Sequence, residues 1–183
     1  LMPEFTFVDV QLIPITKRTE IQKLAASMQL ENPNSTQIIC PTNKMTDAIN
    51  LLCTDANKRK PIRVFVEDFD RYLDTEFKVG DKVMCCKNLY DFNVMNGSVG
   101  EVISRYNTMR EVTKVEDNVE IIFNSFGQIL WDDGIEREIT IEVVDALKHA
   151  YAITIHKSQG SQFDTVIIPL DRAPNLDRTM LYT

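Results

Sequence analysis

The feature that most constrains the fold is a change of pattern along the chain, from alternating strands and helices to consecutive short strands and back again. Apolar residues occur at helical spacing in two segments of the first third, and short apolar runs lie before and between them. Similar apolar runs return near the end of the sequence. Alternation of this kind favours a parallel sheet. The expected strands are residues 5–10, 37–40, 150–155 and 165–170, and the expected helices are residues 19–30, residues 45–52 and a helix from residue 176 onward.

The middle of the chain carries short β-like runs with no helical spacing between them. Two dipeptides, Asn96-Gly97 and Asp133-Gly134, separate some of these runs and are typical of tight hairpin turns. We therefore expect a small antiparallel barrel inserted into an αβ domain. The β-like runs are residues 82–86, 98–104, 119–123 and 135–141.

Boundary loops of the insertion are expected at residues 58–61 and 74–80. The acidic stretch at residues 68–76 favours a solvated helix or loop. The predicted fold class is therefore α/β, a parallel-sheet domain interrupted by a small antiparallel β-barrel. Its predicted parts are residues 1–79 for the first part of the αβ domain, residues 80–145 for the insertion and residues 146–183 for the second part of the αβ domain.

The overall charge restricts how this chain can bind nucleic acid. The formal net charge is -7 at pH 7, whereas a domain that binds nucleic acid through bulk electrostatics is usually basic. Any contact with nucleic acid must therefore be local. The four cysteines fit no zinc spacing, so we expect reduced thiols and no metal site. No run approaches the roughly 18 apolar residues of a membrane-spanning helix, and we expect a cytoplasmic protein.

The apolar run that ends at residue 155 is followed directly by small, polar and basic residues. Hydroxyls are present at Thr154, Ser158 and Ser161, while Lys157 supplies an ammonium and Gly160 supplies backbone donors. Together these groups suit a phosphate at the sheet edge, where αβ proteins bind ligands. The alternative is a capped strand-to-helix turn whose polar residues are only solvated. The residue chemistry by itself leaves both interpretations open.

Residues 154–164, TIHKSQGSQFD, form what we call the motif V string. The string resembles motif V of superfamily 1 helicases of the RecD and Dda type, whose pattern is T-x-H-K-S-Q-G-S-E-F/Y-D. The resemblance implies a RecA-like motor domain that lacks its own P-loop, in which this motif joins the single-stranded DNA track to the nucleotide cleft. Glutamine stands at position 162 where the family usually has glutamate, which keeps an acceptor oxygen but loses the charge. By position, Thr154, His156, Lys157 and Ser158 would face DNA, Gln159 would serve coupling, and Gly160 and Gln162 would face ATP.

Two further segments are similar to the same family. Residues 80–102 contain GDKVM, then KN, then NGSVGEV, a pattern that resembles the start of the family's Src-homology-3-like insertion. Cys40-Pro41-Thr42-Asn43 resembles the A-P-T segment of the second motor domain, which faces the DNA backbone. The resemblance therefore implies DNA contacts at Pro41, Thr42 and Asn43. Either Thr42 or Asn43 is also placed to cap the helix that follows.

Residues needed for ATP hydrolysis are missing from the sequence. None of the six glycines is followed by lysine, so no P-loop is present. No apolar strand ends in the Asp-Glu pair that holds magnesium. Residues 180–183, MLYT, resemble the start of motif VI, which in the family continues to an arginine that contacts the γ-phosphate. We expect no catalytic residue in this chain and no ATP hydrolysis by the chain alone, whereas ATP and Mg²⁺ would bind to the intact enzyme.

The resemblance implies the second motor domain of a 5′ to 3′ DNA helicase, which couples ATP binding and hydrolysis to translocation on single-stranded DNA. The expected partners are single-stranded DNA, the first motor domain of the same polypeptide, and nuclease or other repair subunits. One alternative is a stand-alone, non-catalytic module that binds nucleic acid or a protein partner. Another is an RNA helicase of the same superfamily.

Overall fold

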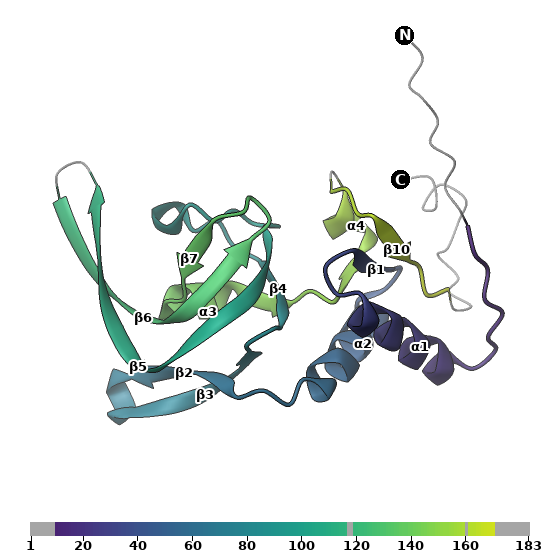
Figure 1. Cartoon of the computed structure of the whole chain (residues 1–183), viewed down its shortest axis with the longest axis horizontal. Helices are drawn as coiled ribbons and strands as arrows, with labels where there is room; N and C mark the ends of the chain where they lie inside the picture. The colour runs from purple at the N-terminus through teal and green to yellow at the C-terminus, as the bar shows by residue number, and fades with distance from the viewer. Residues whose placement is uncertain (1–9, 117–118, 160, 171–183) are drawn as a thin grey trace, which may run out of the picture.

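The structure is a computed structural model that describes residues 10–116, 119–159 and 161–170. It contains two units, which we call the αβ unit and the β unit (Figure 1). The two ends of the described chain build the αβ unit, and the middle builds the β unit. Within the described ranges, no helix is long and apolar enough to cross a membrane.

The αβ unit contains a three-stranded parallel sheet in the order β10-β1-β9. The two longer helices, α1 and α2, pack against each other and against β1. The parallel sheet predicted from the sequence is thus confirmed. The strand predicted at residues 5–10 and the helix predicted from residue 176 fall on residues that, except for residue 10, lie outside the described ranges. The elements are α1 (Arg18–Glu31), β1 (Thr36–Cys40), α2 (Asn43–Ala56), β9 (Ala152–Thr154), α4 (Ile155–Ser158) and β10 (Thr165–Ile167).

Two buried amides fasten the αβ unit together. In α2, Asn50 donates from Nδ2 to the Ala152 carbonyl at 3.0 Å and accepts from the Ala152 backbone N at 2.8 Å. In β1, Gln37 donates from Nε2 to the carbonyls of Ala150 and Tyr151 at 3.1 and 3.2 Å. Because a buried polar group costs free energy unless it is hydrogen-bonded, these contacts fix α2 and β1 against the strand that leads into the motif V string. The apolar core around them consists of Ala25, Ala26, Ile38, Cys40, Met45, Ile49, Cys53, Tyr151 and Ala152.

The β unit is a five-stranded antiparallel sheet in the order β7-β6-β5-β4-β8, beside a separate two-stranded hairpin, β2–β3. The antiparallel pairing predicted for the insertion is confirmed. Over the described residues the sheet order is open, with β7 and β8 at its edges. Gly97 and Gly134 have φ angles of 98° and 77°, as the predicted tight turns require. The elements are β2 (Pro61–Val66), β3 (Arg71–Lys78), β4 (Lys82–Cys85), β5 (Val99–Glu116), β6 (Val119–Trp131), β7 (Glu136–Glu138), α3 (Ile141–Ala146) and β8 (Leu147–His149), with 3-10 turns at Glu67–Phe69 and Tyr90–Phe92.

The β2–β3 hairpin differs from the sequence-based expectation. Residues 68–76, predicted as a solvated helix or loop, overlap β3, so that prediction is wrong. Ile62, Val64 and Phe77 of the hairpin join the hydrophobic core of the β unit. Because these side chains pack with the β unit, we propose that the boundary between the units lies at residues 57–60 and not at residue 80. The core consists of Ile62, Val64, Phe77, Val83, Cys85, Val94, Val102, Phe126, Ile129, Trp131, Ile139, Val143, Ala146 and Leu147.

The strand predicted at residues 150–155 is shorter at both ends in the structure, where β9 covers only Ala152–Thr154. β8, just before it, pairs antiparallel with β4, whereas β9 pairs parallel with β1. The chain turns at Ala150 and Tyr151 because one straight strand cannot pair in both sheets. Beyond β9, α4 begins already at Ile155. The strand predicted at residues 135–141 is also shorter, because Thr140 caps α3 by accepting from the Val143 backbone N at 3.3 Å.

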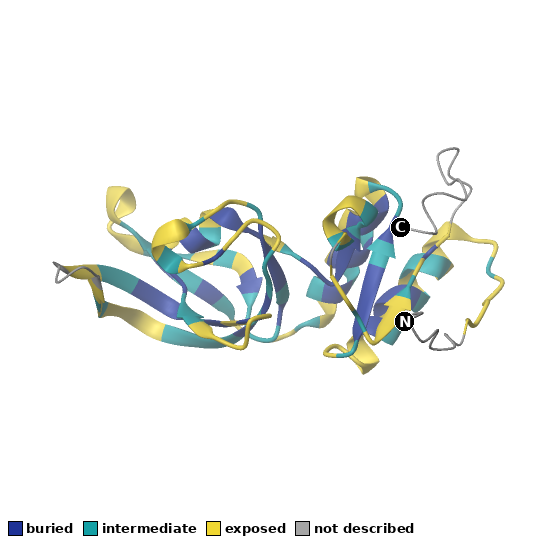
Figure 2. Cartoon of the chain, turned by 90° about the horizontal axis from the view of Figure 1, so that it is seen from above, coloured by how far each residue is buried: buried dark blue, intermediate teal, exposed yellow. Residues whose placement is uncertain are grey.

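Strands β5 and β6 extend well beyond the runs predicted at residues 98–104 and 119–123. Together they form a two-stranded ribbon that projects from the β unit (Figure 1). The ribbon is largely exposed towards its tip (Figure 2). A strand exposed on both faces lacks the simple apolar alternation that indicates a half-buried strand.

Candidate nucleic-acid interface

The carboxyl ends of β1 and β9 lie side by side. Cys40 is the register partner of Thr154 in this parallel pair. The chain leaving each strand therefore emerges at the same edge of the sheet, residues 41–43 after β1 and α4 after β9. Open αβ sheets bind ligands at this edge. Two segments that were identified separately in the sequence thus meet in the structure.

The segment after β1 forms the start of α2. Thr42 is the N-cap, because its Oγ1 accepts a hydrogen bond from the Met45 backbone N at 3.3 Å. Its carbonyl accepts from Thr46 Oγ1 at 3.0 Å. The cap is therefore Thr42 and not Asn43, the next residue, whose side chain is exposed. A helix that begins here also directs free backbone N–H groups towards the edge of the sheet.

Replacing Thr42 by alanine is expected to lower the free energy of unfolding by about 1 kcal/mol, because the first turn of α2 loses its side-chain acceptor. Urea denaturation measures the change. Asn43→Ala is the matched control, since Asn43 is exposed and is not the cap, and its effect should stay within about 0.5 kcal/mol. An equal loss in the two variants would contradict the assignment of the cap.

The segment after β9 is α4, which presents the basic part of the motif V string. Ser158 Oγ donates to the Ile155 carbonyl at 2.8 Å, so this hydroxyl is used within the helix. Lys157 is exposed, and its Nζ lies 3.4 Å from Cys86 Sγ. Thr154 stands at the N-cap position without a capping hydrogen bond from its side chain. The Lys157 ammonium and the Thr154 hydroxyl are therefore open to a ligand.

The remaining predicted residues of the string lie at the surface where the structure describes them. His156, Gln159 and Gln162 are exposed, and Gly160 lies outside the described residues. Within the described ranges, no group of three His, Cys, Asp or Glu side chains could hold a metal ion. Burial raises the pKa of the Cys40 and Cys53 thiols to about 12, which suits apolar packing.

A cavity of about 650 Å³, which we call the strand-end cavity, opens beside these segments. Asn43, Thr154 and Lys157 line it, so the structure brings together one residue of the first segment and two of the second. The other predicted residues do not line the cavity. These are Pro41, Thr42, His156, Ser158, Gln159 and Gln162.

Sequence reasoning missed two basic or titratable side chains of the strand-end cavity, Lys148 and His149. Both belong to β8 and reach the cavity because β8 pairs with β4, where His149 is the register partner of Val83. No local signal in the sequence indicates this pairing. Asp47 and Glu76 also line the cavity. Two lysines and two acidic residues thus line the same cavity.

A buried carboxylate joins the two units next to the strand-end cavity. Asp81 is fully buried and accepts hydrogen bonds from Asn57 Nδ2 at 2.6 Å, from Tyr151 OH at 2.8 Å and from the Lys78 backbone N at 2.8 Å. His149 Nε2 lies 3.2 Å from the same carboxylate. Burial alone would raise the pKa of Asp81, but the hydrogen bonds outweigh burial and leave this pKa below its ordinary value. The network ties the end of α2 to the turn before β4 and to the residues just before β9.

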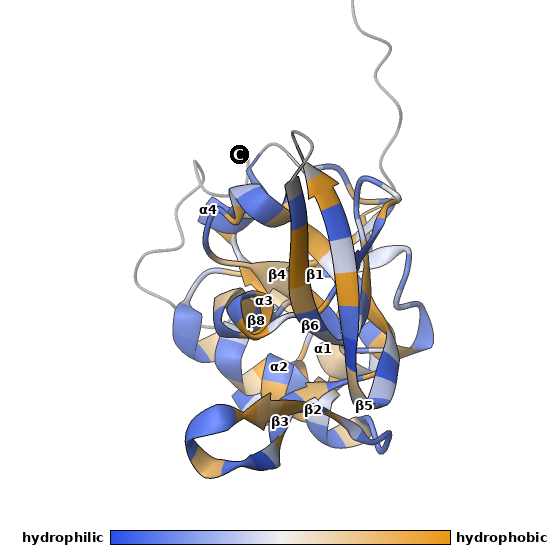
Figure 3. Ribbon diagram, turned by 90° about the vertical axis from the view of Figure 1, so that its left-hand side faces the viewer, coloured by the Kyte–Doolittle hydropathy of each residue, from blue (hydrophilic) through white to orange (hydrophobic). Residues whose placement is uncertain are grey.

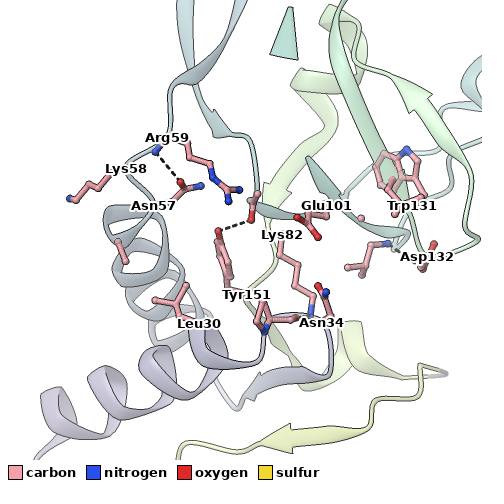
Figure 4. Close-up of a pocket in the computed structure, with 16 residues that line it drawn as sticks. Leu30, Asn34, Asn57, Lys58, Arg59, Lys82, Glu101, Trp131, Asp132 and Tyr151 are labelled. Carbon is pink, nitrogen blue, oxygen red and sulfur yellow. Dashed lines mark hydrogen bonds between the residues drawn. The ribbon is translucent and has the colours of Figure 1, made fainter. Parts of the chain in front are cut away.

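A larger cavity of about 930 Å³ lies between the units, beside the amino end of β1 (Figure 4). Lys82 reaches across it from β4 and donates to the Thr36 carbonyl at 3.0 Å. Burial lowers the pKa of Lys82 to about 8, opposed by its strand neighbour Glu101. Lys82 thus ties the two units together. Arg59 and Lys82 are mixed in the lining of this cavity with Glu101 and Asp132.

This chain is similar to known helicases. Residues 149–183 match the model of the UvrD-like helicase C-terminal domain. The chain is 24% identical over 174 residues to the RecBCD enzyme subunit RecD of Buchnera aphidicola, and the aligned region covers 92% of this chain and 25% of that protein. It is 27% identical over 176 residues to the ATP-dependent DNA helicase Pif1 of Campylobacter jejuni, and the aligned region covers 78% of this chain and 38% of that protein.

Among solved structures, the chain is similar to the Pif1 helicase from Candida albicans, with a TM-score of 0.47, 17% identity and coverage of 82% of this chain and 46% of that one. The chain therefore spans well under two thirds of the length of these relatives. The family-model match and the sequence relatives agree with the motif V string. The chain is a relative of the RecD- and Pif1-type helicases.

Proposed function

We propose that this chain is the second, RecA-like motor domain of an ATP-dependent DNA helicase and that its β unit is the Src-homology-3-like insertion. In the complete enzyme the chain would couple ATP binding and hydrolysis to translocation along single-stranded DNA. The observation that carries the proposal is the register of β1 and β9, which brings residues 41–43 and α4 together beside two lysines. The Pif1 relative is named a DNA helicase, which favours DNA over RNA as the substrate.

The strand-end cavity supplies the DNA contacts in this proposal. Lys148 and Lys157 would pair with phosphates, because both residues line the cavity and both are exposed. Asn43 and Thr154 would hydrogen-bond to the DNA backbone. Thr42 would act indirectly, since its hydroxyl is used to cap α2.

The nucleotide side of the motif V string depends on the rest of the enzyme. Gly160 and Gln162 would face ATP and Mg²⁺ held mainly by the first motor domain of the same polypeptide. Gln159 and His156, exposed on either side of Ser158, would transmit closure of the two domains to the DNA side. The work is mechanical, so the residues of this chain position and couple and do not themselves cleave phosphate.

Binding of single-stranded DNA by the chain alone tests the proposal. Fluorescence anisotropy with a labelled oligothymidylate should give a dissociation constant of about 10⁻⁴ to 10⁻⁶ M at physiological salt. Two lysine–phosphate contacts predict that log K falls with log salt with a slope of about -1.4. The same chain should show no ATP turnover above background, with or without DNA. DNA-stimulated turnover by the purified chain, or DNA binding independent of salt, would contradict the proposal.

An oligouridylate of the same length separates the DNA and RNA alternatives. Equal or tighter binding to RNA would favour the RNA-helicase alternative. The RecD relative is named as a subunit of the RecBCD enzyme, so nuclease or other repair subunits are proposed as further partners. Attachment of both the first motor domain and the continuation of motif VI with its arginine should give ATP turnover, whereas a stand-alone binding module would remain inactive.

A further inference from the structure

A groove of about 510 Å³ lies between the turn that follows β2, strand β6 and the start of α3. We call it the β6 groove. It shares no lining residue with the strand-end cavity. Its exposed apolar side chains are Ile122, which is 62% exposed, and Ile141, which is 39% exposed. Phe69, 61% exposed, stands in the turn beside it. Exposed apolar side chains gathered at one groove are typical of an interaction surface.

The charge of the β6 groove is acidic. Glu67, Asp68 and Glu142 line it, and no lysine or arginine does. In the described part of the chain, none of these three carboxylates has a basic partner at ion-pair distance. Glu120 adds a further exposed carboxylate on the same face of β6 as Ile122, because residues two apart in a strand share a face. Figure 3 shows that the ribbon carries both hydrophobic and hydrophilic residues.

One edge of β6 has no strand partner at this groove. From residue 119 to residue 124, β6 pairs with β5 on one side, whereas β7 joins the other side only at residues 128–130. Ile139, just after β7, extends the pairing on that side, since its carbonyl accepts from the Phe126 backbone N at 2.9 Å and its N–H donates to the Gly127 carbonyl at 2.8 Å. Over the described residues, the free part of this edge is therefore residues 119–124, which offers backbone N–H and C=O groups to a further strand. A free edge of this kind is a template for an added strand.

We propose that the β6 groove binds an extended segment of a protein partner in which basic residues alternate with apolar ones, added as a strand to the free edge of β6. Backbone pairing would supply affinity, Ile122 and Ile141 would contact the apolar side chains, and the carboxylates would pair with lysine or arginine. Nucleic acid does not suit the groove, because the carboxylates repel phosphate. The inference goes beyond the proposed function, since it concerns a separate surface.

Three labelled peptides test the proposal on the chain itself, by fluorescence anisotropy. The first alternates lysine and valine, the second alternates glutamate and valine, and the third alternates lysine and proline, which has no N–H to pair with β6. Only the lysine–valine peptide should bind. The double variant Glu67→Lys/Asp68→Lys should weaken this binding about tenfold, because two favourable charge pairs become repulsive.

The control variant is Glu31→Lys/Asp55→Lys, which makes the same change of charge at two exposed helix positions outside the groove. It should leave binding of the lysine–valine peptide within about twofold of the original value. Circular dichroism and thermal melting establish that both double variants are folded. The proposal is overturned by equal losses in the two double variants, by equal binding of the glutamate–valine peptide or by equal binding of the lysine–proline peptide. Self-association of the chain that Glu67→Lys/Asp68→Lys abolishes would make a second copy the occupant and would also overturn it.

Discussion

Replacing Asp81 by alanine is expected to lower the free energy of unfolding by about 3–5 kcal/mol. The carboxylate is fully buried, and its loss removes the hydrogen bonds that Asn57, Tyr151 and the Lys78 backbone N donate to it. His149 loses the same partner. Asn57 and Tyr151 keep contacts to the Val79 and Gly80 carbonyls at 3.1 and 3.4 Å. A change of this size is a large part of the total stability of about 5–15 kcal/mol of a typical domain. Urea denaturation followed by fluorescence of Trp131, the single tryptophan, measures it.

The matched control for Asp81→Ala is Asp55→Ala, because Asp55 is exposed on α2. Its effect should stay within about 0.5 kcal/mol. Asp81→Asn should give an intermediate loss, since the amide keeps one acceptor oxygen but turns two N–H groups towards existing donors. A loss below about 1 kcal/mol for Asp81→Ala would show that the network does not hold the two units together.

The lowered pKa of Asp81 predicts the direction in which stability depends on pH. A carboxyl whose pKa is lower in the folded state stabilises that state fully at pH values above its ordinary pKa of about 3.9. The contribution is lost as pH falls through the lower folded-state value. The difference in stability between the original chain and Asp81→Asn should therefore shrink as pH falls below about pH 4. Urea midpoints across this range measure it, and a difference that grows in acid would refute the assignment.

The parts of the fold that were predictable depend on local physical chemistry. Apolar spacing in α1 and α2 indicates helices, Pro41 ends a short apolar run, and Asn96-Gly97 indicates a tight turn. The structure contains each of these features. The two segments at the strand ends were also identified from the sequence, and the parallel sheet was expected. Their contact through Cys40 and Thr154 required the strand order β10-β1-β9.

The parts that were not predictable depend on contacts between distant residues. The sequence did not predict β3, because its acidic residues, such as those at positions 74 and 76, are typical of a solvated segment. Phe77 of the same strand is nevertheless buried in the β unit. Lys148 and His149 enter the strand-end cavity only because β8 pairs with β4. The Asp81 network likewise joins groups from separate elements. Tertiary pairing of this kind leaves no periodic signal within a single segment.

Replacing Lys157 by alanine is expected to weaken binding of single-stranded DNA by the chain about tenfold and to reduce the magnitude of the salt slope by about 0.7, the share of one phosphate contact. The ammonium is exposed at the strand-end cavity, so its removal loses one phosphate partner without disturbing the core. In the complete enzyme, which also carries the first motor domain and the motif VI arginine, DNA-stimulated ATP turnover should fall while turnover without DNA stays unchanged. Anisotropy titrations at several salt concentrations and a coupled ATPase assay measure the two effects.

Two control variants separate the charge of Lys157 from its contact with Cys86, whose Sγ lies 3.4 Å from Nζ. Lys23→Ala removes an equal charge from an exposed position on α1 and should change DNA affinity by less than about twofold. Cys86→Ala removes the sulfur contact and keeps the ammonium, so DNA affinity should again be retained. If Cys86→Ala reproduced the loss seen with Lys157→Ala, Lys157 would act through its packing on the β unit and not as a phosphate contact. If Lys157→Ala and Cys86→Ala both left DNA affinity unchanged, the DNA path would have to run elsewhere on the αβ unit.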